Sequence, residues 1–376
     1  MEIVKAAAAL QAGGRSIIHM SIGEPDFGTP EPVQRAAQSA IAAGQTGYTA
    51  ALGIDELRAA IAAHYASAYR LSLPVERIVV TAGASAALLL ALAALLERDA
   101  ELLMPDPSYP CNRHFAAAVE GRARLVPCGP ESRFQLTAES AAAAWGPATR
   151  GVLLASPSNP TGTTIPTRQL TALLALVKAR GGFAIVDEIY QGLTYDQPPR
   201  SALAEDDDVV VINSFSKYFG MTGWRLGWMV APAPLVPVIE KLAQNLFICA
   251  SDVSQRAALA CFEPEALAIC EARRREFARR RDYLVPALRE LGFGVPVTPD
   301  GAFYVYADIG RFSDDSWAFA FDVLDKTGVC LVPGRDFGSA ETRRYVRISY
   351  ATSMDRLAEA LDRLRRYLVE RAPAAA

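Results

Sequence analysis

One lysine in this chain has a sequence setting that favours covalent chemistry with a carbonyl group. Lys217 lies in the segment SFSKYFG at positions 214–220, directly after an apolar run that ends at Ile212. A lysine attacks carbonyl carbons only as the neutral amine, and a desolvated setting lowers its pKa toward that form. The aromatic neighbours favour a buried lysine over a surface lysine in a loop. Lys217 is therefore a candidate Schiff-base nucleophile.

Two other charged residues lie in or beside apolar runs. Asp187 follows the apolar run 183–186, and Arg347 lies in the middle of the apolar run 345–349. Taken alone, Asp187 could be an ordinary aspartate that caps a loop at the end of a strand, and Arg347 could be a surface arginine. The apolar pattern around Arg347 favours an inward-facing guanidinium, whose planar fork suits a carboxylate.

The elements that would position these residues alternate along the chain. Short apolar runs bounded by turn residues predict strands, and apolar positions at helical spacing predict helices. This alternation predicts an α/β fold with a mostly parallel sheet covered by helices on both faces. We expect helices at 30–43, 53–70, 86–96 and 167–180, and strands at 78–80, 102–104, 151–155, 183–186 and 209–212. The strand at 102–104 is expected to be broken by the prolines at 105 and 107.

Polar, turn-rich loops follow several of these expected strands. Ligands of open α/β sheets bind beyond the carboxyl ends of the strands. We therefore expect Ser85, Asn159, Asp187 and the segment after Ile212 to share one crevice.

The pattern changes after about residue 280. Short expected strands at 302–307, 329–332 and 345–349 precede an amphipathic helix at 354–371, and another short amphipathic helix begins the chain. This predicts a large domain, 29–280, and a smaller α/β domain made of residues 1–28 and 281–376.

Composition and charge exclude several classes of protein. With 51% hydrophobic residues, 21% charged residues and a net charge of −3, the chain reads as a globular protein without a nucleic-acid footprint. The arginines at 273–275 and 279–281 are interleaved with glutamates and predict a solvated helix face. No apolar run predicts a membrane span, and the six cysteines show no metal-ligand spacing. We expect reduced thiols, no bound metal and a cytoplasmic protein.

Six segments in order along the chain resemble the signatures of class I aminotransferases, which have fold type I of the enzymes that use pyridoxal 5′-phosphate (PLP). They are the segments at 21–27, Tyr48-Thr49 with Gly53, 156–162, 186–190, 214–227 and 345–349. Because the six span nearly the whole chain, they are far more specific together than any one of them is alone. The resemblance implies that fold, the cofactor PLP, and a transfer of amino groups between L-amino acids and 2-oxo acids.

The resemblance also assigns roles toward the cofactor ring. Lys217 is implied as the residue that holds PLP and later moves a proton, with its pKa lowered by the site. Asp187 is implied to face the ring nitrogen and keep it protonated. Asn159 and Tyr190 are implied to contact the phenolic oxygen, and Tyr109 to stack on the ring. For Asn159 and Tyr109, a turn residue and a packed aromatic residue remain the plain alternatives.

Phosphate and substrate roles follow in the same way. The backbone N–H groups of a helix that starts after Gly83 would bind an anion, helped by side-chain donors. The implied phosphate-binding residues are Ala84, Ser85, Ser214, Ser216 and Arg225, with Tyr48 reaching the phosphate of a neighbouring subunit. The implied substrate-binding residues are Gly23, Asn159 and Arg347. A homodimer with shared active sites is therefore expected.

Two other functions share parts of this pattern. A PLP-dependent lyase of the same fold would use the same cofactor residues, because the cofactor carries most of the chemistry. A PLP-sensing DNA-binding regulator would need a further module, and only about twenty residues precede Ser21. Aspartate-preferring members of the family that this chain resembles often have a lysine at the position of Ser85, which would pair with the second carboxylate of the substrate. A strict aspartate preference is therefore not expected here.

Overall fold

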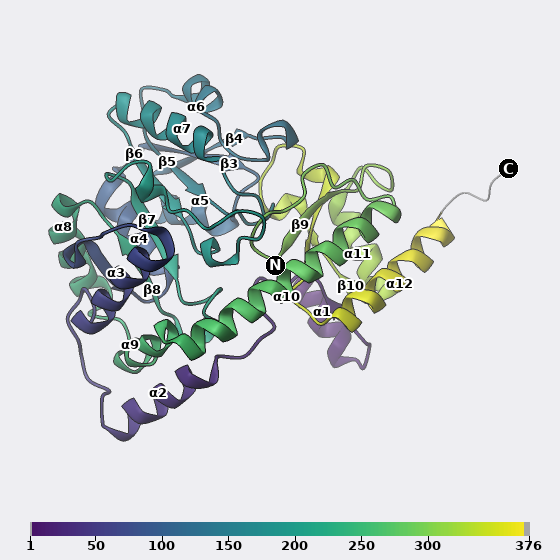
Figure 1. Ribbon diagram of the computed structural model, residues 1–376. Coiled ribbons are helices and arrows are strands. Elements are labelled where there is room, and N and C mark those ends of the chain that lie inside the picture. The colour runs from purple at the N-terminus through teal and green to yellow at the C-terminus, as the bar shows by residue number, and fades with distance from the viewer. Residues whose placement is uncertain (1, 372–376) are drawn as a thin grey trace.

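A seven-stranded sheet forms the larger part of the molecule, as the computed structural model of residues 2–371 shows (Figure 1). Its strand order is β2-β8-β7-β6-β5-β3-β4, and within the described residues β8 alone runs antiparallel to both of its neighbours. The predicted α/β fold with a mostly parallel, mixed sheet is thus confirmed. The strands are β2 (Ile78–Thr81), β3 (Glu101–Asp106), β4 (Arg122–Pro127), β5 (Thr149–Ala155), β6 (Phe183–Asp187), β7 (Val210–Ser214) and β8 (Gly227–Val230).

Helices cover both faces of this sheet because its strands bury side chains on both sides. Val211 and Ile212 are neighbours in β7 that point to opposite faces, and each belongs to a different apolar core. One core is closed by α2 (Glu31–Ala42), α3 (Asp55–Tyr69), α6 (Ala138–Ala144), α7 (Thr167–Ala179) and α9 (Asp252–Leu259). The other is closed by α4 (Ala84–Leu95), α5 (Pro110–Ala118) and α8 (Val236–Leu246).

The smaller part of the molecule has its own apolar core and contains both ends of the described chain. The antiparallel strands β9 (Tyr304–Asp308), β12 (Tyr345–Ser349) and β11 (Val332–Pro333) form its sheet, and β1 (Ile18–His19) pairs with β10 (Val329–Cys330) in parallel. It is covered by α1 (Glu2–Ala12), α10 (Pro264–Glu290), α11 (Ser316–Thr327) and α12 (Met354–Arg371). Helix α10 runs without a break through residue 280, where the sequence places a domain boundary. Residues 1 and 372–376 of the predicted small domain lie outside the described residues.

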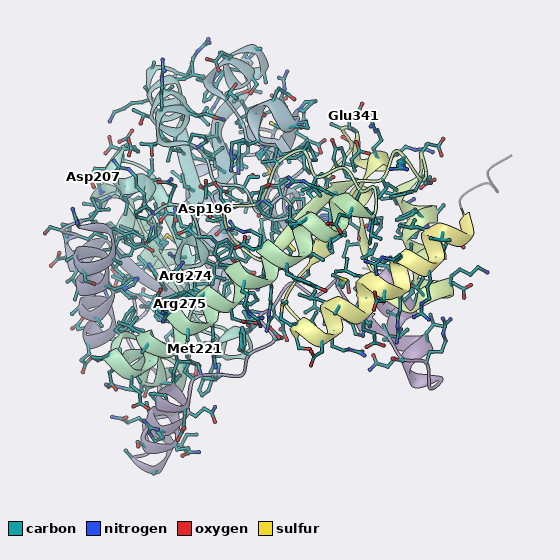
Figure 2. All side chains as sticks on the ribbon, turned by 45° about the vertical axis from the view of Figure 1, so that its right-hand side comes forward. Asp196, Asp207, Met221, Arg274, Arg275 and Glu341 are labelled. Atoms are coloured by element: carbon teal, nitrogen blue, oxygen red, sulfur yellow. The ribbon has the colours of Figure 1, made fainter. Side chains whose placement is uncertain are left out.

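Three local predictions are wrong for physical reasons. Strand β3 is not broken at Pro105. Proline has no backbone N–H to donate, but β3 pairs with β5 only as far as Leu103, so Pro105 leaves the hydrogen bonds between these two strands intact. The single strand expected at 329–332 is two strands in different sheets. The arginines of α10 do not all face solvent: Arg280 and Arg281 are buried, since the helix passes between the two parts of the molecule. Arg274 and Arg275 project from the same helix (Figure 2).

The buried arginines of α10 are paired with carboxylates of other segments. Arg280 bonds Asp26 at 2.7 Å, and Arg281 bonds Asp196 at 2.6 Å. The two ion pairs tie α10 to the N-terminal segment and to the loop after β6. None of the helices between residues 2 and 371 combines the length and apolarity that crossing a bilayer needs.

Candidate active site

The carboxyl ends of the parallel strands bring several predicted residues to one edge of the large sheet. Asp187 is the last residue of β6, Ser214 is the last residue of β7, and Asn159 lies in the loop after β5. Helix α4 begins just after β2 on the same edge, and Arg347 reaches the loop after β5 from β12 of the smaller sheet. The site therefore draws side chains from both parts of the molecule.

Lys217 is half-buried at this edge. Its ammonium Nζ donates to the backbone oxygen of Gly23 at 2.6 Å, which joins two predicted site residues 194 positions apart in the chain. Burial lowers the pKa of Lys217 to about 8, helped by the positive charges of Arg225 and Arg347 and opposed by Glu24 and Asp187. A neutral amine is thus much more accessible here than on a free lysine.

Asp187 is a carboxylate whose charge acts on Lys217, and it is almost fully buried. Its Oδ1 accepts the backbone N–H of Ile189 at 3.0 Å. Burial raises the pKa of Asp187 to about 6, and the N–H of Ile189 and the charge of Lys217 counteract part of that rise. Near neutral pH the side chain is mostly ionised, and a cationic partner would hold it so.

The start of α4 forms a cradle for an anion. Gly83 has φ = +82°, no side chain caps the helix, and a Cβ built on Gly83 would lie 2.7 Å from Arg225 Nη2. The guanidinium therefore lies directly against the backbone that leads into the helix, where N–H groups and the helix dipole favour negative charge. The hydroxyls of Ser214 and Ser216, 2.9 Å apart, lie on the adjoining loop. Ala84 is buried, and Ser85 is exposed beside it.

Arg347 is held in place by both of its terminal nitrogens. Nη1 donates to Asn159 Oδ1 at 2.9 Å, and Nη2 donates to the backbone oxygen of Ser21 at 2.6 Å. The guanidinium lies over the rings of Tyr304 and Phe337, at 4.5 and 4.9 Å from their centroids. Within the described residues, its Nε is buried without a hydrogen-bond partner. A buried cation with an unused donor is suited to an incoming carboxylate.

Two tyrosines of the site share a hydrogen bond that sequence reasoning missed. Tyr190 follows β6, and its hydroxyl lies 2.8 Å from the hydroxyl of Tyr304. Both residues are buried, and burial raises the pKa of both. Tyr304 was expected only as part of a strand, and the sequence carries no signal that places its hydroxyl against Tyr190. Burial is the main cause that raises the pKa of Tyr109. Cys111, Tyr304 and Asp187 make smaller contributions, so Tyr109 lies near the last two residues.

Tyr48 is the predicted site residue that the fold leaves apart from the others. It is 84% exposed and lines a surface hollow with Cys249 and Ser251.

A cavity of about 810 Å³ lies nearer the centre of the site and is lined by Glu24, Arg225 and residues of the loop that follows Lys217.

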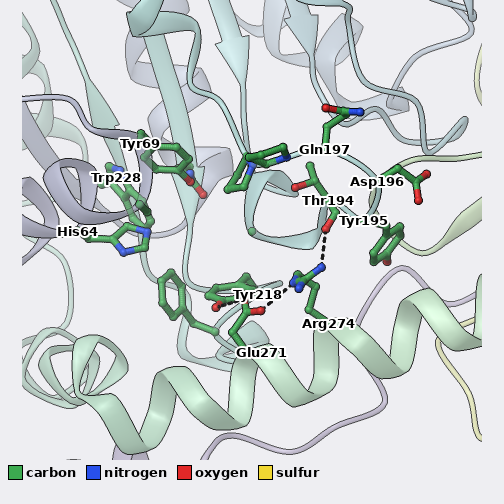
Figure 3. A pocket seen from close by; sticks show the side chains of 16 residues that line it. His64, Tyr69, Thr194, Tyr195, Asp196, Gln197, Tyr218, Trp228, Glu271 and Arg274 are labelled. Atoms are coloured by element: carbon green, nitrogen blue, oxygen red, sulfur yellow. Dashed lines mark hydrogen bonds and ion pairs between the residues drawn. The ribbon is translucent and has the colours of Figure 1, made fainter.

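A second cavity lies on the other side of the Lys217 loop. It has a volume of about 400 Å³, and none of the predicted site residues lines it. Tyr218 points into it and donates to Glu271 at 2.8 Å, while Arg274 donates to the backbone oxygen of Thr194 (Figure 3). Tyr218 thus lines a cavity that its neighbour Lys217 does not line, and Asp196, Glu271 and Arg274 of this cavity are already paired.

The residues at the sheet edge fit PLP as a set. The cradle of α4 and Arg225 fits a phosphate, the buried Asp187 fits a protonated ring nitrogen, and Lys217 fits an aldehyde. Fold and side chains together fit an enzyme that binds a phosphate-bearing cofactor at the carboxyl edge of an α/β sheet.

Comparison with known proteins identifies the family. Residues 15–364 match the family model described as aminotransferase class I and II, and the chain belongs to that family. A valine–pyruvate aminotransferase of Mycobacterium tuberculosis is 41% identical over 98% of this chain and 95% of its own length. A probable N-acetyl-LL-diaminopimelate aminotransferase of Bacillus subtilis is 38% identical over 96% of this chain and 92% of its own.

Solved structures agree with this assignment. The crystal structure of an aminotransferase from Mycobacterium tuberculosis has a TM-score of 0.95 at 41% identity and covers 98% of this chain and 96% of its own. Aspartate aminotransferase from Thermus thermophilus with maleate has a TM-score of 0.92 at 32% identity, covering 97% and 95%. The predicted family, the fold, the cofactor PLP and the transaminase activity on amino acids and 2-oxo acids are thereby confirmed. Nothing in these comparisons supports the lyase alternative.

Proposed function

We propose that the residues at the sheet edge bind different parts of PLP. When bound, PLP supplies a conjugated ring that withdraws electrons from the substrate α carbon. Asp187 keeps the ring nitrogen protonated, and Tyr109 packs on the ring face. The phosphate is held by the N–H groups of Ala84 and Ser85 and by the side chains of Ser214, Ser216 and Arg225. Since Asn159 Oδ1 already accepts from Arg347, its amide N–H group is free to donate to the phenolic oxygen together with Tyr190.

Lys217 carries the proton transfer in this proposal. Its Nζ would hold the cofactor through the aldehyde group, and as a free amine Nζ would be the base that takes and returns a proton. The single observation that carries the proposal is the half-buried Lys217, which donates to Gly23 and has its pKa lowered to about 8 by desolvation and by two arginines. An amine with that pKa exchanges protons readily near neutral pH, which a free lysine does not.

Arg347 and Gly23 bind the substrate α-carboxylate in this arrangement. The orphan Nε of Arg347 and the close approach allowed by a residue without a side chain at position 23 support this role. Because Asn159 bonds Arg347 directly, it takes part in carboxylate binding as well as in cofactor binding.

For the substrate class, we propose an aliphatic L-amino acid as donor and pyruvate as acceptor. The proposal rests on the 41% identity to a relative named valine–pyruvate aminotransferase and on Ser85, which offers no charge to a second carboxylate. The test is a panel of valine, phenylalanine and aspartate as donors, each with pyruvate and with 2-oxoglutarate, and of alanine with 2-oxoglutarate alone, because alanine and pyruvate would only regenerate each other. Valine with pyruvate should give the highest kcat/KM. A tenfold preference, about 1.4 kcal/mol, for aspartate with 2-oxoglutarate would refute the substrate proposal and leave the transaminase assignment intact.

We also propose a homodimer in which Tyr48 completes the site of the partner. Large apolar side chains are exposed at the end of α2 and at the end of α8: Ile41, Leu246 and Ile248 are between 51% and 59% exposed. Such a group of exposed apolar residues is typical of a protein interface.

Two experiments test the dimer. Sedimentation should give twice the chain mass. Mixing the inactive Lys217→Ala chain with a Tyr48→Phe chain should form hybrid dimers with one native site, and thus restore activity above that of either chain alone.

Two broader assignments follow as proposals. We propose that residues 29–280 and residues 1–28 with 281–376 act as two domains, because the apolar core that contains Ile18 and Met20 also contains most of the apolar residues after 280. A cytoplasmic location is supported by six cysteines that are all unpaired, as thiols are in a reducing compartment.

A further inference from the structure

Tyr304 occupies a position between three of the residues to which the proposed function assigns roles. Its hydroxyl lies 2.8 Å from the hydroxyl of Tyr190, and its ring lies under the guanidinium of Arg347 at 4.5 Å. A Cβ built on Gly23 would come within 3.2 Å of the same hydroxyl. The side chain is completely buried, so no solvent competes for these contacts.

The direction of the tyrosine–tyrosine hydrogen bond follows from its surroundings. Either hydroxyl could donate, but each has only one proton. The guanidinium of Arg347 lies over the ring of Tyr304, whereas no such contact is found for the ring of Tyr190 among the described residues, so the positive charge makes the hydroxyl of Tyr304 the more acidic. Burial raises the pKa of both tyrosines, and Arg347 counteracts part of the rise in each. The more acidic hydroxyl is the better donor. Tyr304 therefore donates to Tyr190, and the proton of Tyr190 remains available for another acceptor.

We infer that Tyr304 is a positioning residue that aims the hydroxyl proton of Tyr190 at the phenolic oxygen of PLP. The inference rests on the proposed role of Tyr190 and adds a residue that makes that role possible. Without Tyr304, Tyr190 could rotate or share its proton, and its donation to the cofactor would weaken. The neighbouring cation also gives Tyr304 a fixed ring orientation, since Arg347 is itself held at both ends by Asn159 and Ser21.

The test uses Tyr304→Phe, which keeps the ring and removes the hydroxyl. Tyr306→Phe is a matched control: Tyr306 lies two positions along β9, is equally buried, and has a hydroxyl without a partner among the described residues. The visible absorbance of the PLP-loaded enzyme is titrated with pH. A donor to the phenolic oxygen withdraws its negative charge and so eases loss of the neighbouring nitrogen proton. Tyr304→Phe should therefore raise the titration midpoint by roughly 0.3–1 pH unit, the scale of one weakened hydrogen bond, and Tyr306→Phe should leave it unchanged.

A double-mutant cycle separates this role from a merely structural one. In a Tyr190→Phe background, Tyr304→Phe should produce no further shift, because its effect passes through the hydroxyl of Tyr190. A shift of the same size in that background, or no shift in the single variant, overturns the inference. If the unmodified protein shows no pH-dependent absorbance of bound PLP, the assignment of Tyr190 and Lys217 fails instead, so the two failures are distinguishable.

Discussion

Arg347 and Asn159 are joined by a hydrogen bond of 2.9 Å that links the smaller sheet to the loop after β5. The residue proposed to bind the substrate carboxylate and a residue proposed to contact the cofactor are thus one hydrogen-bonded unit. Both are buried, so neither can move to a new partner in solvent when the other is removed. Substrate recognition and cofactor contact are consequently coupled at this point.

Removing the guanidinium of Arg347 should weaken substrate binding much more than PLP binding. We expect Arg347→Ala to lower kcat/KM for amino acids on the order of 100-fold, mainly through KM, because a charge-assisted hydrogen bond is worth about 1.5–3 kcal/mol. The Kd for PLP should change only a few-fold, through Asn159. Steady-state kinetics and fluorescence titration with PLP measure the two effects. Arg344→Ala, at a half-exposed arginine just before β12, is the control. Equal losses of substrate and cofactor binding would argue against the carboxylate role.

Loss of the site amine should abolish both the bond to the cofactor and catalysis. We expect Lys217→Ala to eliminate the visible absorbance of the lysine–PLP bond and nearly all activity, since no other lysine nitrogen is bonded to Gly23 in the described part of the chain. Spectra and a transamination assay check this. Lys241→Ala removes an exposed lysine of α8 and should behave like the unmodified protein. Normal turnover by Lys217→Ala would show that the assignment is wrong.

A single methyl group should damage the phosphate cradle. In Gly83→Ala the new Cβ would meet Arg225 Nη2 at 2.7 Å, and φ = +82° strains any residue with a side chain. We expect the Kd for PLP to rise at least about tenfold as the guanidinium is displaced, the equivalent of about 1.4 kcal/mol. Gly181→Ala shares the positive φ, at +65°, but meets no atom within 4 Å. Gly181→Ala should lower the free energy of unfolding by about 1–2 kcal/mol, as the strain of a positive φ does in Gly83→Ala, but it should leave the PLP affinity unchanged. Similar PLP affinities in both variants would exclude the steric explanation.

Glu188 should make stability depend on pH. Burial raises the pKa of Glu188 from 4.5 to about 8, although its carboxylate accepts hydrogen bonds from Ser201 and Ala202. The folded state therefore keeps a proton that the unfolded state releases between these values. Its contribution to stability is fully present below about pH 4.5 and is lost as the pH rises toward about 8.

The measurement is urea unfolding of the unmodified protein and of Glu188→Gln at pH 5 and pH 8. The stability of the glutamine variant relative to the unmodified protein should improve by on the order of 2 kcal/mol between the two pH values. Glu290→Gln, at an exposed residue, should show no such change. A constant difference between Glu188→Gln and the unmodified protein would mean that Glu188 is ionised in the folded state.

Local signals in the sequence predicted much of the fold and which candidate residues would lie together. Lys217, Asp187 and Asn159 each lie at or just beyond the end of an apolar strand, and the geometry of parallel sheets brings such positions to one edge. Tyr304 could not be found in this way, because its contact with Tyr190 depends on how two sheets face each other. The burial of Arg280 was missed for a similar reason: a helix that serves two cores has no single solvated face, so its charge pattern misleads.

The order of site residues along the chain has a practical consequence. The residues proposed to hold PLP within one subunit lie between Ala84 and Arg225, whereas Gly23 and Arg347 belong to terminal segments that the pairing of β1 with β10 brings into one unit. A chimera that takes both termini from a relative would therefore inherit that relative's carboxylate-binding surface on an unchanged cofactor platform. The two chain ends are best exchanged together, because one alone would leave half of a shared sheet without its native partner.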